Sequence, residues 1–108
     1  MLELKNRSCF VLSKGTPPMN NQQIVEFKSM LTSEWNIQEN QKLKKEFQFE
    51  NFKRAIAFVQ EIALIAEKEQ HHPDICIQYT TVEIELSTHD IGGLSENDFI
   101  MAAKIESL

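Results

Sequence analysis

The feature that most constrains the fold of this chain is one long amphipathic segment, residues 51–70. Its apolar side chains recur every three or four residues, which is the spacing of one face of a helix. The members of this stripe are Phe52, Ala55, Ile56, Val59, Ile62, Ala63 and Ala66. Pro73 limits the helix on its C-terminal side, because the residue before a proline avoids helical backbone angles. Phe58 and Ile65 flank the stripe, so we expect the same helix to contact a second subunit.

Shorter patterns before and after this helix predict the other elements. Alternating apolar residues indicate strands, and apolar residues three and four positions apart indicate helices. In chain order we expect a helix at 21–32, strands at 34–38 and 42–49, the helix at 51–70, a hairpin with strands at 74–79 and 82–88, and a helix at 96–106. The order α-β-β-α-β-β-α predicts an α+β fold, a four-stranded antiparallel sheet with helices packed on one face.

The first twenty residues differ in character from the rest of the chain. They contain Gly15 and the pair Pro17-Pro18, and consecutive prolines disfavour both a helix and a central strand. We therefore expect an irregular arm at residues 1–20. Residues 21–108 are expected to form a single domain, because the whole chain of 108 residues has the length of one domain.

Charge and cysteine content exclude several classes of protein. The net charge of −5 argues against direct binding of nucleic acid, which usually requires a basic face. Cys9 and Cys76 lie far apart and form no CxxC motif, which predicts a reducing compartment and no disulfide framework. The N-terminus has no long apolar run, and no segment reaches the length of a membrane span. We therefore expect a cytoplasmic protein that does not bind membranes.

The three histidines of the chain lie where the predicted hairpin meets the end of the helix at 51–70. His71 and His72 precede the first hairpin strand, and His89 follows the second. A loop centred between residues 80 and 81 would pair residue 75 with residue 86 and, further along the ladder, His72 with His89. We therefore expect three imidazole rings around a single pocket at one end of the sheet.

Two carboxylates have positions that predict distinct roles. Glu67 precedes His71 by four residues, so the two would share one helix face if the helix continued. A carboxylate there fixes the tautomer of an imidazole and favours its protonated form, an arrangement typical of general acid–base catalysis. Asp98 follows Ser95 by three residues, the spacing of a capping box, and we interpret both as caps of the last helix.

Other interpretations of the same residues remain open. The His-His pair before Pro73 has a simpler interpretation as polar residues at a helix end. A metal site is the main chemical rival, with donors at His71, His72, Asp74 and His89. Against it, adjacent residues at the start of a strand point to opposite sides, and the chain has no HExxH motif. The sequence supports nucleophilic catalysis even less, because Cys76 is expected in mid-strand and Ser87 does not lie in a nucleophile-elbow motif.

Taken together, these residues resemble the signature of the pterin-4a-carbinolamine dehydratases. The signature here reads Glu67-x3-His71-His72-Pro73, followed by Tyr79, His89 and Asp98. The segments FENFKRAIAFVQEIALIAEKEQHHPD and LSTHDIGGLSENDF also resemble this family, as does the tryptophan of SEWNI before KEFQF. The resemblance covers residues 20–107, and it is specific because two adjacent histidines with a third at a fixed distance rarely recur by chance.

The resemblance implies a reaction as well as an α+β fold. The reaction is dehydration of 4a-hydroxytetrahydropterin, the 4a-carbinolamine, to quinonoid dihydropterin, with neither metal nor cofactor. It would recycle the pterin used by aromatic amino acid hydroxylases. The resemblance assigns catalysis to His71, His72 and His89, with Glu67 as the orienting carboxylate.

The resemblance also implies contacts and partners. Gln70, Ser87 and Thr88 match the positions that contact the pterin, although Gln70 departs from the acidic residue of some members. Trp35 is interpreted as a core or groove-edge residue, and we include it among the candidate substrate contacts. The implied partners are a pterin, further copies of the chain in a homodimer or homotetramer, and a pterin-dependent hydroxylase. The alternative is a non-catalytic protein-binding module, because animal relatives also act as coactivators.

Overall fold

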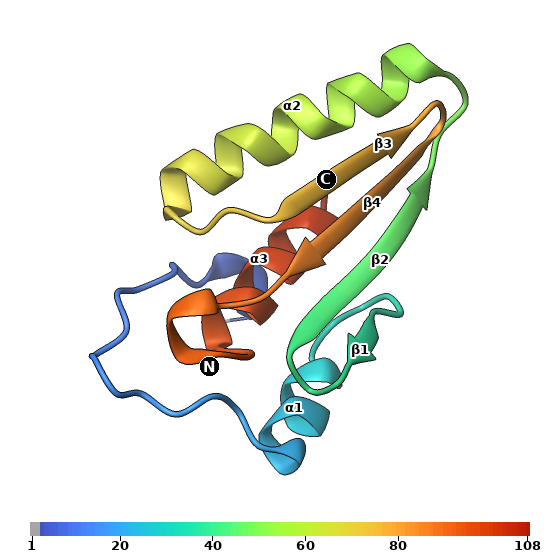
Figure 1. Ribbon diagram of the computed structural model, residues 1–108. Helices are drawn as coiled ribbons and strands as arrows, with labels where there is room; N and C mark the ends of the chain where they lie inside the picture. Colours follow the sequence, from blue (N-terminus) through green and yellow to red (C-terminus); the bar gives the residue numbers. More distant parts are fainter. Residues whose placement is uncertain (1–2) are drawn as a thin grey trace.

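Within residues 3–108, the part of the chain that this computed structural model describes, four strands form one antiparallel sheet in the order β1-β2-β4-β3 (Figure 1). The strands are Asn36–Gln38 (β1), Lys42–Gln48 (β2), Asp74–Gln78 (β3) and Thr81–Leu86 (β4). The helices are Asn21–Lys28 (α1), Phe52–Glu69 (α2) and Glu96–Glu106 (α3), with short 3₁₀ turns at Leu4–Asn6 (η1) and His89–Ile91 (η2). The predicted α+β fold and the order α-β-β-α-β-β-α are confirmed.

Side-chain contacts fix where the first helix begins and ends. The Asn20 side chain accepts the N–H of Gln23 at 2.9 Å, and the Gln23 side chain accepts the N–H of Asn20 at 3.0 Å. The helix predicted at 21–32 ends earlier, at Lys28. The reason is that the backbone N–H of Thr32 donates to the carboxylate of Glu106 at 2.6 Å, which holds this segment as a loop against α3. Within residues 3–108, no helix is both long enough and apolar enough to cross a bilayer.

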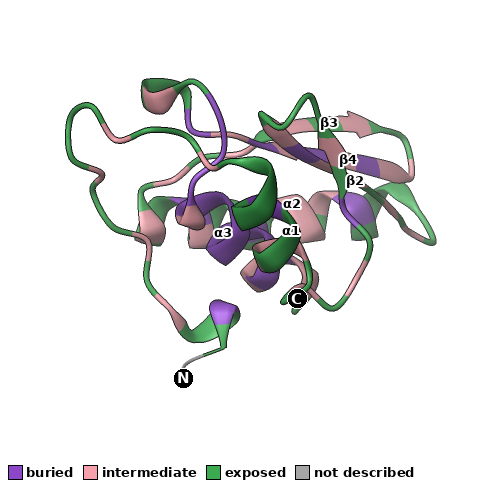
Figure 2. Cartoon of the chain, turned by 90° about the horizontal axis from the view of Figure 1, so that it is seen from below, coloured by how far each residue is buried: buried purple, intermediate pink, exposed green. Residues whose placement is uncertain are grey.

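The helices lie on one side of the sheet and enclose the core with it (Figure 2). Three alternate residues of β4 are fully buried: Val82, Ile84 and Leu86. The intervening Glu83 and Glu85 point to the other face, where they pair with Lys44 and Lys42 of β2 at 3.3 and 2.9 Å. This alternation is typical of an antiparallel sheet with a single covered face.

The β3–β4 hairpin has a different register from the one predicted. Ile75 pairs with Ile84, two residues away from its expected partner. Tyr79 does not continue β3, because it adopts a left-handed conformation, with a φ of 54°, in the turn. A shift of two residues leaves every side chain on its predicted face of the sheet. The predicted pairing of His72 with His89 is nevertheless wrong, because β4 ends before His89 and the chain enters η2.

The N-terminal arm lies along α3 before it continues toward α1 (Figure 1). Leu4 of η1 is buried in the core. Lys104 donates to the backbone carbonyl of Lys5 at 2.9 Å, and Arg7 pairs with Glu96 at 3.1 Å. From residue 3 onward, η1 is the one regular element in the predicted arm. The arm is therefore attached to the last helix although it contains little secondary structure.

Candidate active site

A cavity of about 780 Å³ lies between the N-terminal arm, the end of α2 and the start of α3. Its lining comprises residues 9–15 of the arm, residues 68–71 at the end of α2, and Thr88, Asp90, Ile91 and Asn97. The volume is in the usual range for small-molecule sites. Segments that are distant in the sequence thus surround one space, and His71 is the histidine that lines it.

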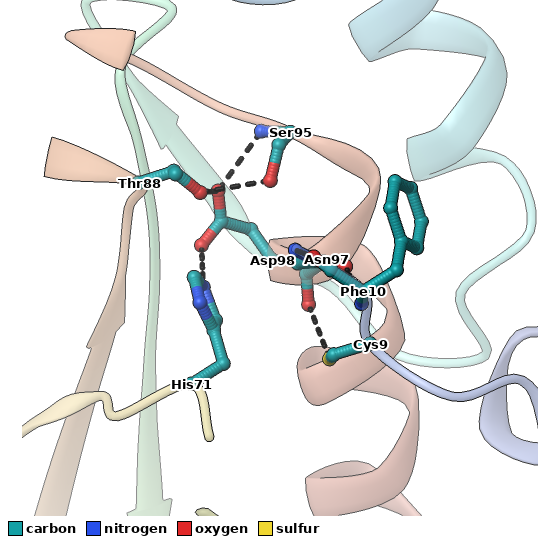
Figure 3. Close-up of polar contacts among 7 residues, drawn as sticks. All are labelled: Cys9, Phe10, His71, Thr88, Ser95, Asn97 and Asp98. Atoms are coloured by element: carbon teal, nitrogen blue, oxygen red, sulfur yellow. Dashed lines mark hydrogen bonds and ion pairs between the residues drawn. The ribbon is translucent and has the colours of Figure 1, made fainter. Parts of the chain in front are cut away.

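A buried carboxylate holds His71 in this cavity. The Nε2 atom of His71 lies 2.6 Å from Oδ1 of Asp98, in the first turn of α3 (Figure 3). The Asp98 side chain is fully buried, and 13% of the His71 side chain is exposed. Because an ionised carboxylate can only accept hydrogen bonds, Nε2 carries the proton, and the neutral ring has an unprotonated Nδ1.

Two donors hold the other oxygen of the same carboxylate. Oδ2 of Asp98 accepts the hydroxyl of Thr88 at 2.8 Å and the backbone N–H of Ser95 at 3.0 Å (Figure 3). The hydroxyls of Ser95 and Thr88 lie 2.8 Å apart, and Ser95 must donate here because Thr88 gives its one proton to Asp98. The predicted capping contact between Ser95 and Asp98 is confirmed. The sequence pattern did not indicate that Asp98 also binds His71.

This arrangement is suited to proton transfer. The carboxylate of Asp98 stabilises the imidazolium that forms when the second ring nitrogen of His71 takes up a proton. Since Asp98 is buried and accepts hydrogen bonds from His71, Thr88 and Ser95, its own orientation is restricted. His71 can therefore act as a general base, or in its protonated form as a general acid, on a ligand in the cavity.

His72 has a different carboxylate partner. Its Nε2 lies 2.5 Å from Oε2 of Glu67, and 56% of the His72 side chain and 73% of the Glu67 side chain are exposed. The prediction that Glu67 orients His71 is therefore wrong. The physical reason is that α2 ends at Glu69 and Gln70 adopts a left-handed conformation with a φ of 54°. The chain reverses there and brings His72, two residues later, back over the last turn of α2.

The three imidazole rings do not share one cavity. His89 begins η2 and lines a neighbouring cavity of about 130 Å³, together with Ser87 and Thr88. Thr88 lines both cavities, whereas His72 is in the lining of neither. The prediction of a single pocket is corrected accordingly: His71 and His89 border separate spaces that meet at Thr88. Among residues 3–108, no three His, Cys, Asp or Glu side chains cluster closely enough to hold a metal ion.

Gln70 and Trp35, two further candidates, have different surroundings. Gln70 lines the larger cavity, and its side-chain amide donates to the backbone carbonyl of Glu67 at 2.6 Å. Trp35 is fully buried, and its indole N–H donates to Glu106 at 2.9 Å. Its ring meets that of Phe47 edge-on, with 6.0 Å between the centroids. These contacts support the interpretation of Trp35 as a core residue rather than as a contact of the substrate.

Sequence patterns missed most of the lining of the larger cavity, including the arm segment 9–15 and Asn97. The amide of Asn97 binds the backbone of Phe10, which is 87 residues away in the sequence. No periodic pattern connects residues at such a separation. The only available signal was the position of Asn97 in the segment LSTHDIGGLSENDF, next to Asp98.

Sequence comparison relates most of the chain to one family. The sequence pattern of the family described as Pterin 4 alpha carbinolamine dehydratase matches residues 17–108. A protein of Alkaliphilus metalliredigens, provisionally named pterin-4-alpha-carbinolamine dehydratase, is 42% identical over 106 residues, which cover 98% of this chain and 96% of that protein. A Rickettsia canadensis protein with the same provisional name is 42% identical over 107 residues, covering 99% of this chain and 98% of its own.

Two solved structures have a similar fold. One is described as a transcriptional coactivator/pterin dehydratase from Brucella melitensis; its TM-score is 0.77 at 30% identity, over 82% of this chain and 95% of that chain. The other is a pterin dehydratase-like protein described as a RuBisCO assembly factor in the alpha-carboxysome; its TM-score is 0.61 at 26% identity, over 70% and 89% of the two chains. The descriptions of these two proteins name roles in transcription and assembly as well as dehydration.

Proposed function

The chain belongs to the pterin-4a-carbinolamine dehydratase family, and on this premise we propose that it dehydrates 4a-hydroxytetrahydropterin to quinonoid dihydropterin. The observation that carries the proposal is His71, which lines a ligand-sized cavity and is bound to a buried carboxylate. The reaction consists of proton movements around one bond cleavage. The hydroxyl oxygen takes up a proton and leaves as water as the C4a–O bond breaks, and N5 loses its proton as the N5=C4a double bond forms.

His71 is suited to one of these two proton transfers. With Nε2–H bound to Asp98, the neutral ring can accept the N5 proton at Nδ1, and the resulting imidazolium can donate. Asp98 then acts as a positioning residue, since it fixes the ring and balances the charge that develops on it. The general acid–base contribution of such a group is typically about 10²–10⁴-fold.

His72 and His89 are the candidates for the second proton transfer. A flat ligand that extends from the larger cavity past Thr88 would meet His71 on one side and His89 on the other. The backbone of Ser87 can offer donor and acceptor groups to such a heterocycle. The backbone N–H of Thr88 is not available in the same way, because it donates to the carbonyl of Gly93 at 2.8 Å. His72, with its ring bound to the carboxylate of Glu67, is the more exposed alternative. We assign Gln70, Ser87 and Thr88 to substrate binding.

Three finer features complete the proposal. The product would return to the pterin pool of an aromatic amino acid hydroxylase, which is the partner enzyme that we propose. We propose a homodimer or homotetramer, supported by apolar side chains of α2 that are exposed in the single chain, Phe52 and Leu64. We also propose a cytoplasmic location, which is consistent with the unpaired Cys9 and Cys76.

Binding of another protein without catalysis is the second candidate function. The descriptions of the two solved relatives, as a coactivator and as an assembly factor, favour it. It requires no chemistry at His71 or His89. A purified chain that fails to dehydrate a synthetic 4a-carbinolamine, yet binds a partner protein specifically, would support this function over the first.

A direct assay of 4a-carbinolamine breakdown, followed by ultraviolet absorbance, tests the proposed reaction. We expect the wild-type chain to accelerate breakdown and His71→Ala to lower kcat by about 10²–10⁴-fold. Asp98→Asn retains the shape of the side chain and an acceptor for the Ser95 N–H, but it lacks the negative charge; we expect kcat to fall while KM changes little.

Asn36→Ala is the control variant, because Asn36 is an exposed residue of β1 outside the lining of both cavities. It should retain wild-type turnover, and circular dichroism should show a folded protein for every variant. Normal turnover by His71→Ala would contradict the role of His71. An inactive wild-type chain would reject the reaction itself.

A further inference from the structure

We propose that residues 9–15 of the arm form the outer wall of the substrate site, and that Asn97 is the positioning residue that holds this wall in place. The inference rests on the proposed function, because it takes the cavity lined by His71 as the pterin site. It adds a segment that determines which pterins are accepted. Residues 9–15 lie outside 17–108, the range matched by the family's sequence pattern.

Asn97 binds the arm through two reciprocal hydrogen bonds. The backbone N–H of Phe10 donates to Oδ1 of Asn97 at 3.0 Å, and Nδ2 of Asn97 donates to the carbonyl of Phe10 at 2.7 Å (Figure 3). Only 5% of Asn97 is exposed, so water competes poorly for these groups. The side-chain amide thus binds both polar groups of one peptide residue and fixes the position of the arm against α3.

A second anchor lies one residue earlier in the arm. The backbone N–H of Cys9 donates to Oε1 of Glu69 at 2.7 Å, and the side chain of Glu69 is 6% exposed. Lys104 lies 3.9 Å from the other oxygen of Glu69 and balances its charge. The arm is therefore attached to the last residue of α2 as well as to the first turn of α3. His71 follows the end of α2 by two residues, and Asp98 lies in the first turn of α3.

Beyond these anchors the arm continues along the cavity. Residues 11–15 all line it, and Val11 is 97% exposed, which shows that this stretch packs little against the core. Gly15 has a φ of 87°, a left-handed conformation that costs glycine little and most other residues more. The shape of this wall therefore depends on the two anchors and on the turn at Gly15, rather than on burial.

The two walls of the cavity are coupled through adjacent residues. Asp98 binds His71 on one side, and Asn97 binds Phe10 on the other (Figure 3). The first turn of α3 thus sets the separation between the proton-transferring ring and the arm. Pterins share the bicyclic ring and differ in the substituent at C6. If the ring lies against His71, the arm contacts this substituent, and fixing the arm favours pterins whose side chain is long enough to reach it.

The test compares two 4a-carbinolamines, one with the dihydroxypropyl side chain of biopterin and one with a methyl group at C6. For Asn97→Ala we expect KM for the biopterin form to rise about tenfold, KM for the methyl form to stay within about twofold, and kcat to fall less than about threefold. Asn36→Ala should leave both KM values and kcat unchanged. In the wild type, 7,8-dihydrobiopterin should slow hydrogen exchange of the amides of residues 9–15.

The outcomes separate this inference from the proposed function. An active wild type whose KM values are unchanged in Asn97→Ala would overturn the role of the arm and leave the reaction standing. An equal rise of KM for both substrates, or a loss confined to kcat, would overturn the assignment of specificity. A wild type that neither turns over the carbinolamine nor binds 7,8-dihydrobiopterin in calorimetry would overturn both proposals.

Asn97→Asp is the second variant, for use if Asn97→Ala does not fold. It has the same shape and retains an acceptor for the Phe10 N–H, but it places an oxygen opposite the Phe10 carbonyl. The same tenfold selective rise in KM is expected for it, and an unchanged KM in this folded variant would equally overturn the inference.

Discussion

The two oxygens of the Asp98 carboxylate make different contacts. Oδ2 accepts the N–H of Ser95 at the start of α3, and Oδ1 binds the ring of His71. A substitution by alanine would remove both contacts and would confuse loss of helix capping with loss of ring orientation. Asparagine keeps an acceptor at the cap and removes the charge beside the imidazole, which is why Asp98→Asn is the informative variant.

Cys9 gives a prediction that depends on the same anchors of the arm. Its burial, together with the negative charge of Glu69, raises the pKa of the Cys9 thiol to about 12. At pH 8 only about one molecule in 10⁴ then carries the thiolate, which is the reactive form. We expect iodoacetamide to alkylate Cys9 at least about 100-fold more slowly in the folded chain than in the urea-unfolded chain, as measured by mass spectrometry.

Cys76 is the internal control for this measurement, because it is exposed on β3. It should be alkylated readily in both states. If Cys9 reacted at the same rate in the folded and the unfolded chain, the described attachment of the arm would be absent in solution.

Among the secondary-structure elements, α3 also holds a loop that is distant from it in the sequence. The carboxylate of Glu106, its last residue, accepts hydrogen bonds from the backbone and hydroxyl groups of Thr32 and Ser33 and from the indole of Trp35. Burial alone would raise the pKa of Glu106, but these hydrogen bonds outweigh it and lower the pKa below its ordinary value of 4.5. The loop that joins α1 to β1 is thus held by an ionised group.

This contact predicts how stability depends on pH. A carboxyl group whose pKa is lowered by folding stabilises the fold above its unfolded pKa, and that contribution is lost as the pH falls through the folded pKa. We expect the free energy of unfolding of the wild type to decrease as the pH falls below about 5. Glu106→Gln should make this decrease shallower and lower the free energy of unfolding at pH 7 by about 1–2 kcal/mol.

Urea titrations followed by the fluorescence of Trp35, the single tryptophan, measure both effects. Glu50→Gln is the matched control, because Glu50 is exposed and lies outside this network. An identical pH dependence for Glu106→Gln and the wild type would contradict the stabilising role of the ionised carboxylate.

Helices and strands were predictable from the sequence where the spacing of apolar residues follows the side of the element that is buried. The apolar stripe of residues 51–70 corresponds to α2, and the alternation at residues 82–86 corresponds to β4, because both patterns repeat with the geometry of the backbone. The hairpin register was not predictable in this way, since it depends on the left-handed conformation of Tyr79 in the turn. The early end of α1 depends on Glu106, which is 74 residues distant from Thr32.

In the whole molecule, the candidate site combines parts that were predictable to different degrees. The resemblance to a family singled out the histidines, Glu67 and Asp98, and the fold that it implied is confirmed. The pairing of rings with carboxylates was predicted incorrectly, because it depends on the chain reversal at Gln70. The contribution of the arm could not be predicted, because it rests on contacts across long sequence separations. Cys9 contacts Glu69, 60 positions away, and Phe10 contacts Asn97, 87 positions away.

The proposed oligomer gives a prediction for the assembled molecule. Leu64 is 67% exposed on α2, and Val25 is 69% exposed on α1. If α2 lies in the subunit interface, Leu64→Glu places a charge in an apolar contact and should shift the protein toward smaller species. Val25→Glu, a matched change on another helix, should leave the mass unchanged. Sedimentation velocity measures both, and a monomeric wild type, or an equal effect of the two substitutions, would contradict this interface.

Because successive residues of a helix are rotated by about 100°, the directions of Asn97 and Asp98 are set by where α3 begins. Removing or adding a single residue in the connection from Thr88 to Ser95 would disturb the close approach of Thr88 and Ser95 to Asp98, to which they donate at 2.8 and 3.0 Å. We therefore expect the fold to tolerate a change in the length of this connection less well than most substitutions within it. Insertions and deletions there should be rarer over evolutionary time than substitutions.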